Sequence, residues 1–223
     1  KGLPDFYTSK IQADVQSFTT MASDLKAFTL PLDSMSHLPI PIDLPEMKPI
    51  DFSGNFNGSY YNFVSDLQMK MAENSHLSIH SSYRAGRQSP RYVDLKIEGN
   101  QFPLGLWVNK PLLLGKGDFH ARLSSGDTLC KGLPLNMMVH FDKLKFNGYN
   151  YVNLDFDGEM CHDSLFINFK VLDPHLDMDA KGFVSLDKKA SSRINLKIRK
   201  SDFRTLNIWH EQDFHLKTNA WVQ

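Results

Sequence analysis

Strict alternation of apolar and polar residues dominates the chain from Leu144 to Ile208, and it constrains the fold more than any other feature. Within this stretch Val152, Leu154 and Phe156 alternate with polar residues. Successive side chains of a β-strand point to opposite faces of the sheet, so each such strand has one apolar face and one polar face. A long succession of these strands predicts either a closed core or an open apolar trough.

The rest of the chain repeats this pattern, with two interruptions. A short alternating strand is expected within residues 5–18, and strands begin again after Ile50, giving about a dozen antiparallel strands in all. Leu104 to Leu114 is the least alternating part and predicts a short helical or irregular crossing. The sequence therefore predicts a mainly β fold in which helix is a small minority.

One helix is expected near the N-terminus. Met21, Leu25 and Phe28 recur at the spacing of a single helical face. Thr20 can cap this helix, and Pro31 ends it.

A proline-rich segment from Pro31 to Pro49 separates this region from the later strands. Each proline fixes φ and removes a backbone donor, so we expect an extended crossing segment that either covers an apolar surface or links two domains. Residues 1–49 are thus expected to hold a short strand, a helix and the crossing segment, and residues 50–223 a continuous antiparallel sheet. Whether the two regions form one domain is left open.

The apolar stripes around Asn147-Gly148 conflict with a simple hairpin. A two-residue turn there would put Val152, Leu154 and Phe156 on the opposite face from Leu144. We therefore predict a loop with an odd number of residues, and also a β-bulge near Asp142-Lys143.

Composition limits the classes of function. Lys plus Arg and Asp plus Glu both number 25, so the net charge is zero, which argues against nucleic-acid binding and against a polybasic membrane anchor. The chain begins at Lys1 without a targeting segment, and we expect it to be a piece of a larger protein. Cys130 and Cys161 lack a zinc-binding spacing, and the sequence leaves open whether they form a disulfide or remain free thiols.

No catalytic constellation, metal site or cofactor site is predicted. His76 and His80 would stand about 13 Å apart on the outer face of a strand, too far apart to share a metal ion. Asp177 and Asp179 are typical of the solvated face of an amphipathic strand. Gly115-Lys116-Gly117 lacks the spacing and the helix of a phosphate loop.

Several phrases of the sequence resemble one known family. They are LKFNGYNYVNLDFDGEM (144–160), LFINFKVLDPHLDMDAKGFVSL (165–186) and INLKIRKSDFRTLNI (194–208), with similar pieces at 2–28, 50–71 and 102–123. Together they look like the repeating body of TamB-type proteins, the translocation and assembly module proteins of the AsmA-like group. The F-N-G-Y-x-Y and D-P-x-L-x-x-D-x-x-G phrases are the most specific of these.

The resemblance implies a β-taco, which is an elongated antiparallel sheet folded along its length into an apolar groove. It implies a parent protein that is anchored in the inner membrane and spans the periplasm of a Gram-negative bacterium. Such a protein would carry phospholipid or another acyl lipid toward the outer membrane, contact an outer-membrane barrel protein and support outer-membrane assembly. This chain would be a segment from the middle of the span.

An apolar groove suits acyl chains, because burying each methylene is favourable by ~0.8 kcal/mol. Alternation assigns a set of residues to the groove lining, and its methionines suit a surface that accommodates varied chains. These residues are Leu67, Met69, Met71, Leu77, Ile79, Val93, Leu95, Ile97, Val152, Leu154, Phe156, Leu165, Ile167, Phe169, Leu176, Met178, Ile194, Leu196 and Ile198.

Two other classes of function stay open from the sequence. The same residues could form the closed core of a structural β-sandwich or β-solenoid in a surface or adhesin-like protein. The chain could also be an enzyme, such as a glycosidase that uses Asp177 and Asp179. A connected open groove would distinguish the first of these from lipid transport.

Overall fold

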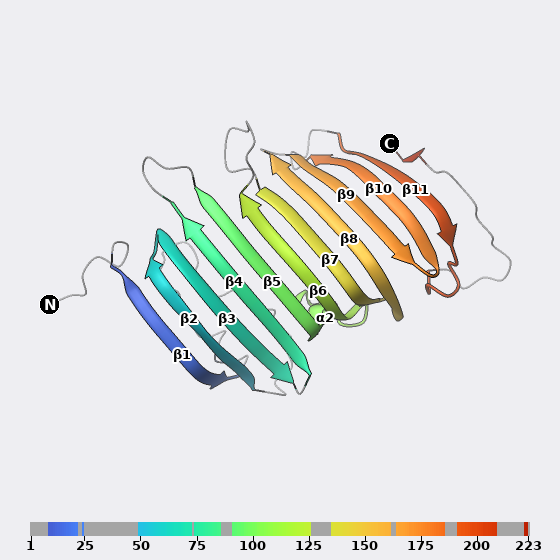
Figure 1. Ribbon diagram of the computed structural model, residues 1–223. Coiled ribbons are helices and arrows are strands. Elements are labelled where there is room, and N and C mark those ends of the chain that lie inside the picture. The colour runs from blue at the N-terminus through green and yellow to red at the C-terminus, as the bar shows by residue number, and fades with distance from the viewer. Residues whose placement is uncertain are drawn as a thin grey trace.

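The computed structural model describes residues 9–21, 24, 49–72, 74–85, 91–125, 135–161, 164–185, 191–208 and 221–222. These residues form one antiparallel sheet of 12 strands that follow one another in sequence order (Figure 1). Within the described residues the first and last strands do not pair, so the sheet is open rather than closed into a barrel. The prediction of a mainly β, antiparallel fold is confirmed.

Most strands are long and paired along most of their length. They are β1 (Ile11–Thr20), β2 (Ile50–Ser59), β3 (Asn62–Ala72), β4 (Ser75–Arg84), β5 (Tyr92–Phe102), β6 (Leu114–Ser125), β7 (Leu135–Phe146), β8 (Tyr149–Cys161), β9 (Ser164–Asp173), β10 (Leu176–Ser185), β11 (Arg193–Ser201) and the two-residue β12 (Trp221–Val222). A single sheet in this order differs from the two facing sheets of a β-sandwich. β1 pairs with β2 in this same sheet.

A short helix, α2 (Leu104–Trp107), connects β5 to β6, as the break in alternation predicted. The helix expected after Thr20 is not confirmed. Asp24 is helical, and its carboxylate accepts a hydrogen bond of 3.3 Å from the backbone N–H of Met21. The remainder of that expected helix and the proline-rich segment up to residue 48 lie outside the described residues.

The prediction of an odd loop at Asn147-Gly148 is wrong. Phe146 pairs with Tyr149, so the loop has two residues, and both have positive φ (48° and 80°), as a type I′ hairpin turn requires.

The predicted bulge is present and accounts for the shift of the apolar stripe. Asp118 pairs with Lys143 and Phe119 with Phe141, which leaves Asp142 as the extra residue of β7. On the adjoining strand β8 the irregularity falls at Asn153, where φ is 52°. The bulge, and not the loop, moves the apolar stripe of β7 from odd-numbered positions, such as Phe141, to even-numbered positions, such as Leu144.

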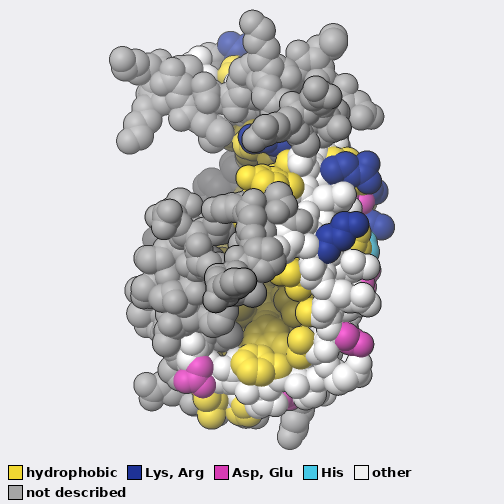
Figure 2. Space-filling view, turned by 90° about the vertical axis from the view of Figure 1, so that its left-hand side faces the viewer, with side chains coloured by type: hydrophobic (Ala, Val, Ile, Leu, Met, Phe, Trp, Pro, Cys, Tyr) yellow, Lys and Arg dark blue, Asp and Glu magenta, His cyan; other side chains and the backbone are white. Residues whose placement is uncertain are grey.

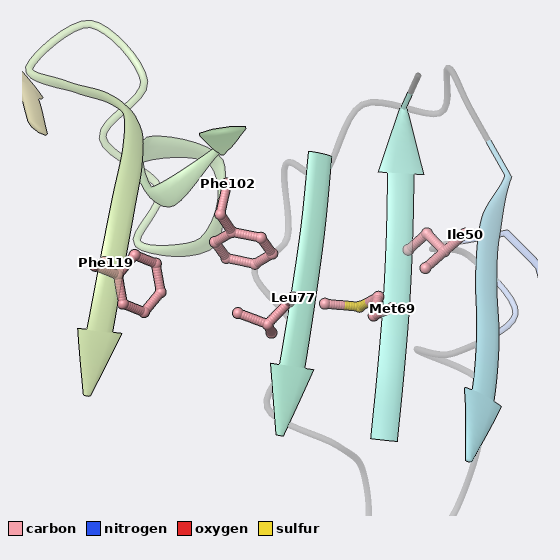
Figure 3. Packing of buried hydrophobic residues seen from close by; sticks show 5 residues of the cluster. All are labelled: Ile50, Met69, Leu77, Phe102 and Phe119. Atoms are coloured by element: carbon pink, nitrogen blue, oxygen red, sulfur yellow. The ribbon is translucent and has the colours of Figure 1, made fainter. Parts of the chain in front are cut away.

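Most of the buried hydrophobic residues gather in two clusters on the same face of the sheet. The first consists of Ile50, Met69, Leu77, Phe102 and Phe119 (Figure 3). α2 packs on this cluster, and the Trp107 indole N–H points to the sulfur of Met71 at 3.2 Å. The members of the second cluster are Tyr151, Leu154, Val171, Leu176 and Leu206.

Candidate functional site: an apolar face across eleven strands

Register places one unbroken line of apolar residues and glycine across β1 to β11. Paired residues of neighbouring strands point to the same face, so the pairings can be followed from strand to strand. This central row runs Phe18, Phe52, Met69, Leu77, Gly99, Phe119, Phe141, Leu154, Val171, Met178 and Ile198.

Gly99 belongs to the row because no side chain fits there. A Cβ at this position would lie 2.2 Å from the nearest ring carbon of Phe119. The ring therefore takes the place of a side chain on β5, and the apolar line is continuous across the glycine.

A second row is also free of polar side chains and lies two residues from the central row on every strand except β1, where an irregularity makes the separation three. It runs Val15, Gly54, Leu67, Ile79, Ile97, Ala121, Val139, Phe156, Phe169, Ala180 and Leu196. We call the face that carries the central and second rows the apolar face. With strands ~4.8 Å apart, each row extends roughly 48 Å.

Burial differs between the two ends of the strands. At the end that holds α2 and the turn at 203–208, apolar side chains are fully buried, as for Val171 at 1 % and Leu206 at 0 % exposure. Most of the second row, including Leu67, Ile97 and Leu196, is only half-buried. The apolar face is thus packed at one end and accessible along the rest of the strands.

A hollow opens on the apolar face at the β1 end of the sheet. It has a volume of about 870 Å³, and Val15, Phe18, Phe52 and Leu67 are among the residues that line it. Figure 2 looks at the molecule from this end and shows hydrophobic side chains gathered in the hollow. At the edge itself Val15 and Phe18 are 43 % and 53 % exposed.

The structure places every predicted lining residue on the apolar face except Val152. Val152 pairs with Lys143, and the two line a hollow on the opposite, polar face. The irregularity at Asp142 and Asn153 exchanges the two faces of β8 at this point. Tyr151 therefore faces the core in place of Val152.

Sequence reasoning omitted several residues of the two rows from the predicted lining. Phe119 and Phe141 lie in the central row, and Ala121 and Val139 in the second. The alternation that identified the other lining residues is equally clear in β6 and β7. Leu206 had no such signal, because it lies in a turn beyond the last alternating strand.

The opposite face carries charged and polar side chains in pairs. His80 Nδ1 lies 2.6 Å from Asp66 Oδ1, and this hydrogen bond is the main cause that lowers the pKa of Asp66. His140 Nδ1 lies at the same distance from Asp155 Oδ1. In the described part of the chain no three His, Cys, Asp or Glu side chains come together as metal ligands.

The two carboxylates considered for an enzyme share one cation. Arg199 donates to Asp177 Oδ1 at 2.6 Å through Nη1, and to Asp179 through Nη2. These hydrogen bonds raise the pKa of Arg199. One guanidinium therefore bridges both carboxylates on a solvent-exposed face of the sheet and balances one of their two negative charges.

Cys161, the last residue of β8, is disulfide-bonded. The one other cysteine of the sequence, Cys130, lies outside the described residues. Disulfides persist in oxidising compartments and are rare in the cytosol.

Among the helical residues that the structure describes, none belongs to a helix with the length and apolar content needed to cross a membrane.

Comparison with known proteins found no matching family model, no matching curated protein and no matching solved structure.

Proposed function

We propose that the chain is a segment of a periplasmic lipid-transport protein that carries phospholipid acyl chains along its apolar face. The observation that supports this most is the pair of rows without polar side chains across β1 to β11. A core of ordinary packing does not need rows that run uninterrupted from one edge of a sheet to the other. A moving acyl chain does, because a polar group in its path would have to be desolvated.

The transport step is partition and sliding, with no covalent chemistry. Each methylene that leaves water gains ~0.8 kcal/mol, and this gain is similar at every position of a uniformly apolar row. The acyl chain can therefore pass from strand to strand without being held in a deep free-energy minimum. The half-buried state of Leu67, Ile97 and Leu196 leaves room for such contacts.

The proposal includes the setting that the TamB-type resemblance implies. The parent protein would be anchored in the inner membrane of a Gram-negative bacterium, contact an outer-membrane barrel protein and support outer-membrane assembly. The disulfide at Cys161 agrees with an oxidising compartment such as the periplasm.

Site-specific photocrosslinking tests the proposal, because neighbouring positions of one strand point to opposite faces. A photoreactive amino acid is placed at Leu67 or Leu196 on the apolar face, and at Gln68 or Lys197 as the adjacent control. Each protein is irradiated with phospholipid vesicles, and the crosslinked lipid is identified by mass spectrometry. We expect phospholipid adducts at the apolar positions only; equal adducts at the control positions, or none at either, would contradict the proposal.

A further inference from the structure

A second hollow lies on the polar face, where four neighbouring strands are irregular at the same level. β5 departs from register at Gln101, which has φ 47°, and β6 does so between Leu114 and Gly117. β7 has its bulge at Asp142, and Asn153 of β8 has a φ of 52°. Bulges bend a strand and redirect its side chains, and they are enriched next to functional sites.

This hollow has a volume of about 530 Å³ and is lined by three lysines. Lys143 and Lys145 come from β7, and Lys116 comes from β6. We call it the lysine hollow. Asn150 adds an amide to its lining.

One carboxylate, that of Asp118, lines the lysine hollow, and it is already engaged. Asp118 Oδ1 accepts hydrogen bonds from the Gln101 backbone N–H at 2.6 Å and from Gln101 Nε2 at 3.0 Å. None of the three lysines forms an ion pair with an acidic residue that the structure describes. The chain as a whole has zero net charge, so this is a local excess of positive charge.

Gly115, the neighbour of Lys116 in β6, leaves room for the side chain of Lys145 from β7. A Cβ at Gly115 would lie 2.9 Å from Cβ and Cδ of Lys145, so the stem of Lys145 lies directly over β6. Like charges on neighbouring strands destabilise a sheet, and an anion bound between them removes this cost.

We propose that the lysine hollow binds an oxyanion of the phosphate class. Three ammonium groups supply the charge, and the amide of Asn150 supplies a further donor. Recognition is by side chains from the three strands β6, β7 and β8. Gly115-Lys116-Gly117 lies within β6 and is not a phosphate loop. The site faces away from the apolar face, so this inference does not depend on the proposed lipid transport.

Calorimetric titration of the 223-residue chain with inorganic pyrophosphate tests the site. The variant K143Q/K145Q removes two charges from the hollow, and K181Q/K197Q removes two charges from exposed lysines elsewhere on the same face. We expect the affinity for pyrophosphate to fall at least tenfold in the first variant and less than twofold in the second. Affinity should also fall as salt is raised, because exposed charges are screened.

Vesicle flotation separates two sources of the phosphate group. Phosphatidylcholine vesicles with and without phosphatidylglycerol are mixed with the native chain and both variants. Binding to phosphatidylglycerol vesicles that K143Q/K145Q loses identifies a lipid headgroup, whereas binding of pyrophosphate alone identifies a soluble phosphate compound; either result supports the site. Equal affinities of the two variants, or no pyrophosphate binding by the native chain, would overturn the proposal.

Discussion

The phenol of Tyr149 donates a hydrogen bond of 2.7 Å to the carboxylate of Asp173. Asp173 is 6 % exposed, and it also accepts from the backbone N–H groups of Val152 at 3.0 Å and His175 at 2.8 Å. Tyr149 and Val152 lie in β8, Asp173 ends β9, and His175 lies in the turn before β10. One buried carboxylate therefore ties together two strands and a turn beside the second buried cluster.

Removing this carboxylate should destabilise the fold more than removing the phenol. Asp173→Ala leaves two backbone donors and the phenol without their partner, and we expect a loss of roughly 1–3 kcal/mol in the free energy of unfolding. Tyr149→Phe removes one donor and should cost about 1 kcal/mol. The exposed carboxylate of Asp157 provides the control, and Asp157→Ala should change stability by less than about 0.5 kcal/mol. Chemical denaturation measures all three, and equal effects of the two aspartate variants would refute this role of Asp173.

The same contact predicts a dependence of stability on alkaline pH. Burial, followed by the hydrogen bond to Asp173 and its charge, raises the pKa of Tyr149 to about 12 from an ordinary value near 10. Below pH 10 the tyrosine is neutral in both the folded and the unfolded chain, and its contribution is complete. Between pH 10 and 12 the unfolded chain ionises first, so this contribution is lost as pH rises.

Tyr149→Phe isolates that effect from other groups that titrate in the same range. The native protein should be more stable than the variant at pH 8, and the difference should shrink as pH rises from 10 to 12. Denaturation curves of both proteins across this range provide the measurement. A stability difference between the two proteins that stays constant would mean that Tyr149 has the same pKa in the folded and the unfolded chain.

Leucines on opposite faces of neighbouring strands should respond differently to truncation. Leu154 lies in the central row at 6 % exposure, whereas Leu172 is 45 % exposed. We expect Leu154→Ala to cost about 2–4 kcal/mol, because it removes buried apolar area and leaves a cavity. Leu172→Ala should cost less than about 0.5 kcal/mol. Similar losses in both variants would contradict the assignment of the faces.

Thiol titration should detect the disulfide at Cys161. The denatured, unreduced chain should show no free thiol, and Cys161→Ser should release one, because the sequence has two cysteines. A bond to Cys130 closes a loop of about 31 residues, so reduction should lower stability by roughly 3–4 kcal/mol in the chain-entropy model. Two free thiols in the native chain would contradict the bond.

Alternation predicted the class of fold and almost all of the apolar face, because the side-chain period of a strand is independent of its partners. It failed at Val152, where the face depends on the bulge in β7 and on the irregular backbone at Asn153 of β8, which the sequence of a single strand does not reveal. The expectation of an odd loop at Asn147-Gly148 failed for the same reason. The bulge already brings the apolar residues of β7 and β8 to the same face, so Asn147-Gly148 keeps the two-residue turn that is usual for Asn-Gly.

The lysine hollow was not predictable from sequence. Lys116 precedes Lys143 by a whole strand and a connection, and neither lies in a motif. Both line the hollow because of the register of β6 and β7, and Gly115 leaves room there for the stem of Lys145. Register between strands and close packing at glycine are tertiary properties, which a reading of single strands does not contain.

Lipid analysis of the chain purified without detergent tests the central claim most directly. The native chain is compared with a variant carrying Leu154→Asp, Leu196→Asp and Ile198→Asp on the apolar face. A matched variant carries the same added charge on the polar face, through Asn57→Asp, Asn136→Asp and Asn195→Asp, and circular dichroism confirms that all three proteins are folded. Extraction and mass spectrometry should find phospholipid in the native chain and the polar-face variant, and none in the apolar-face variant. Absence of lipid from a folded native chain, or equal lipid in all three proteins, would contradict transport along the apolar face.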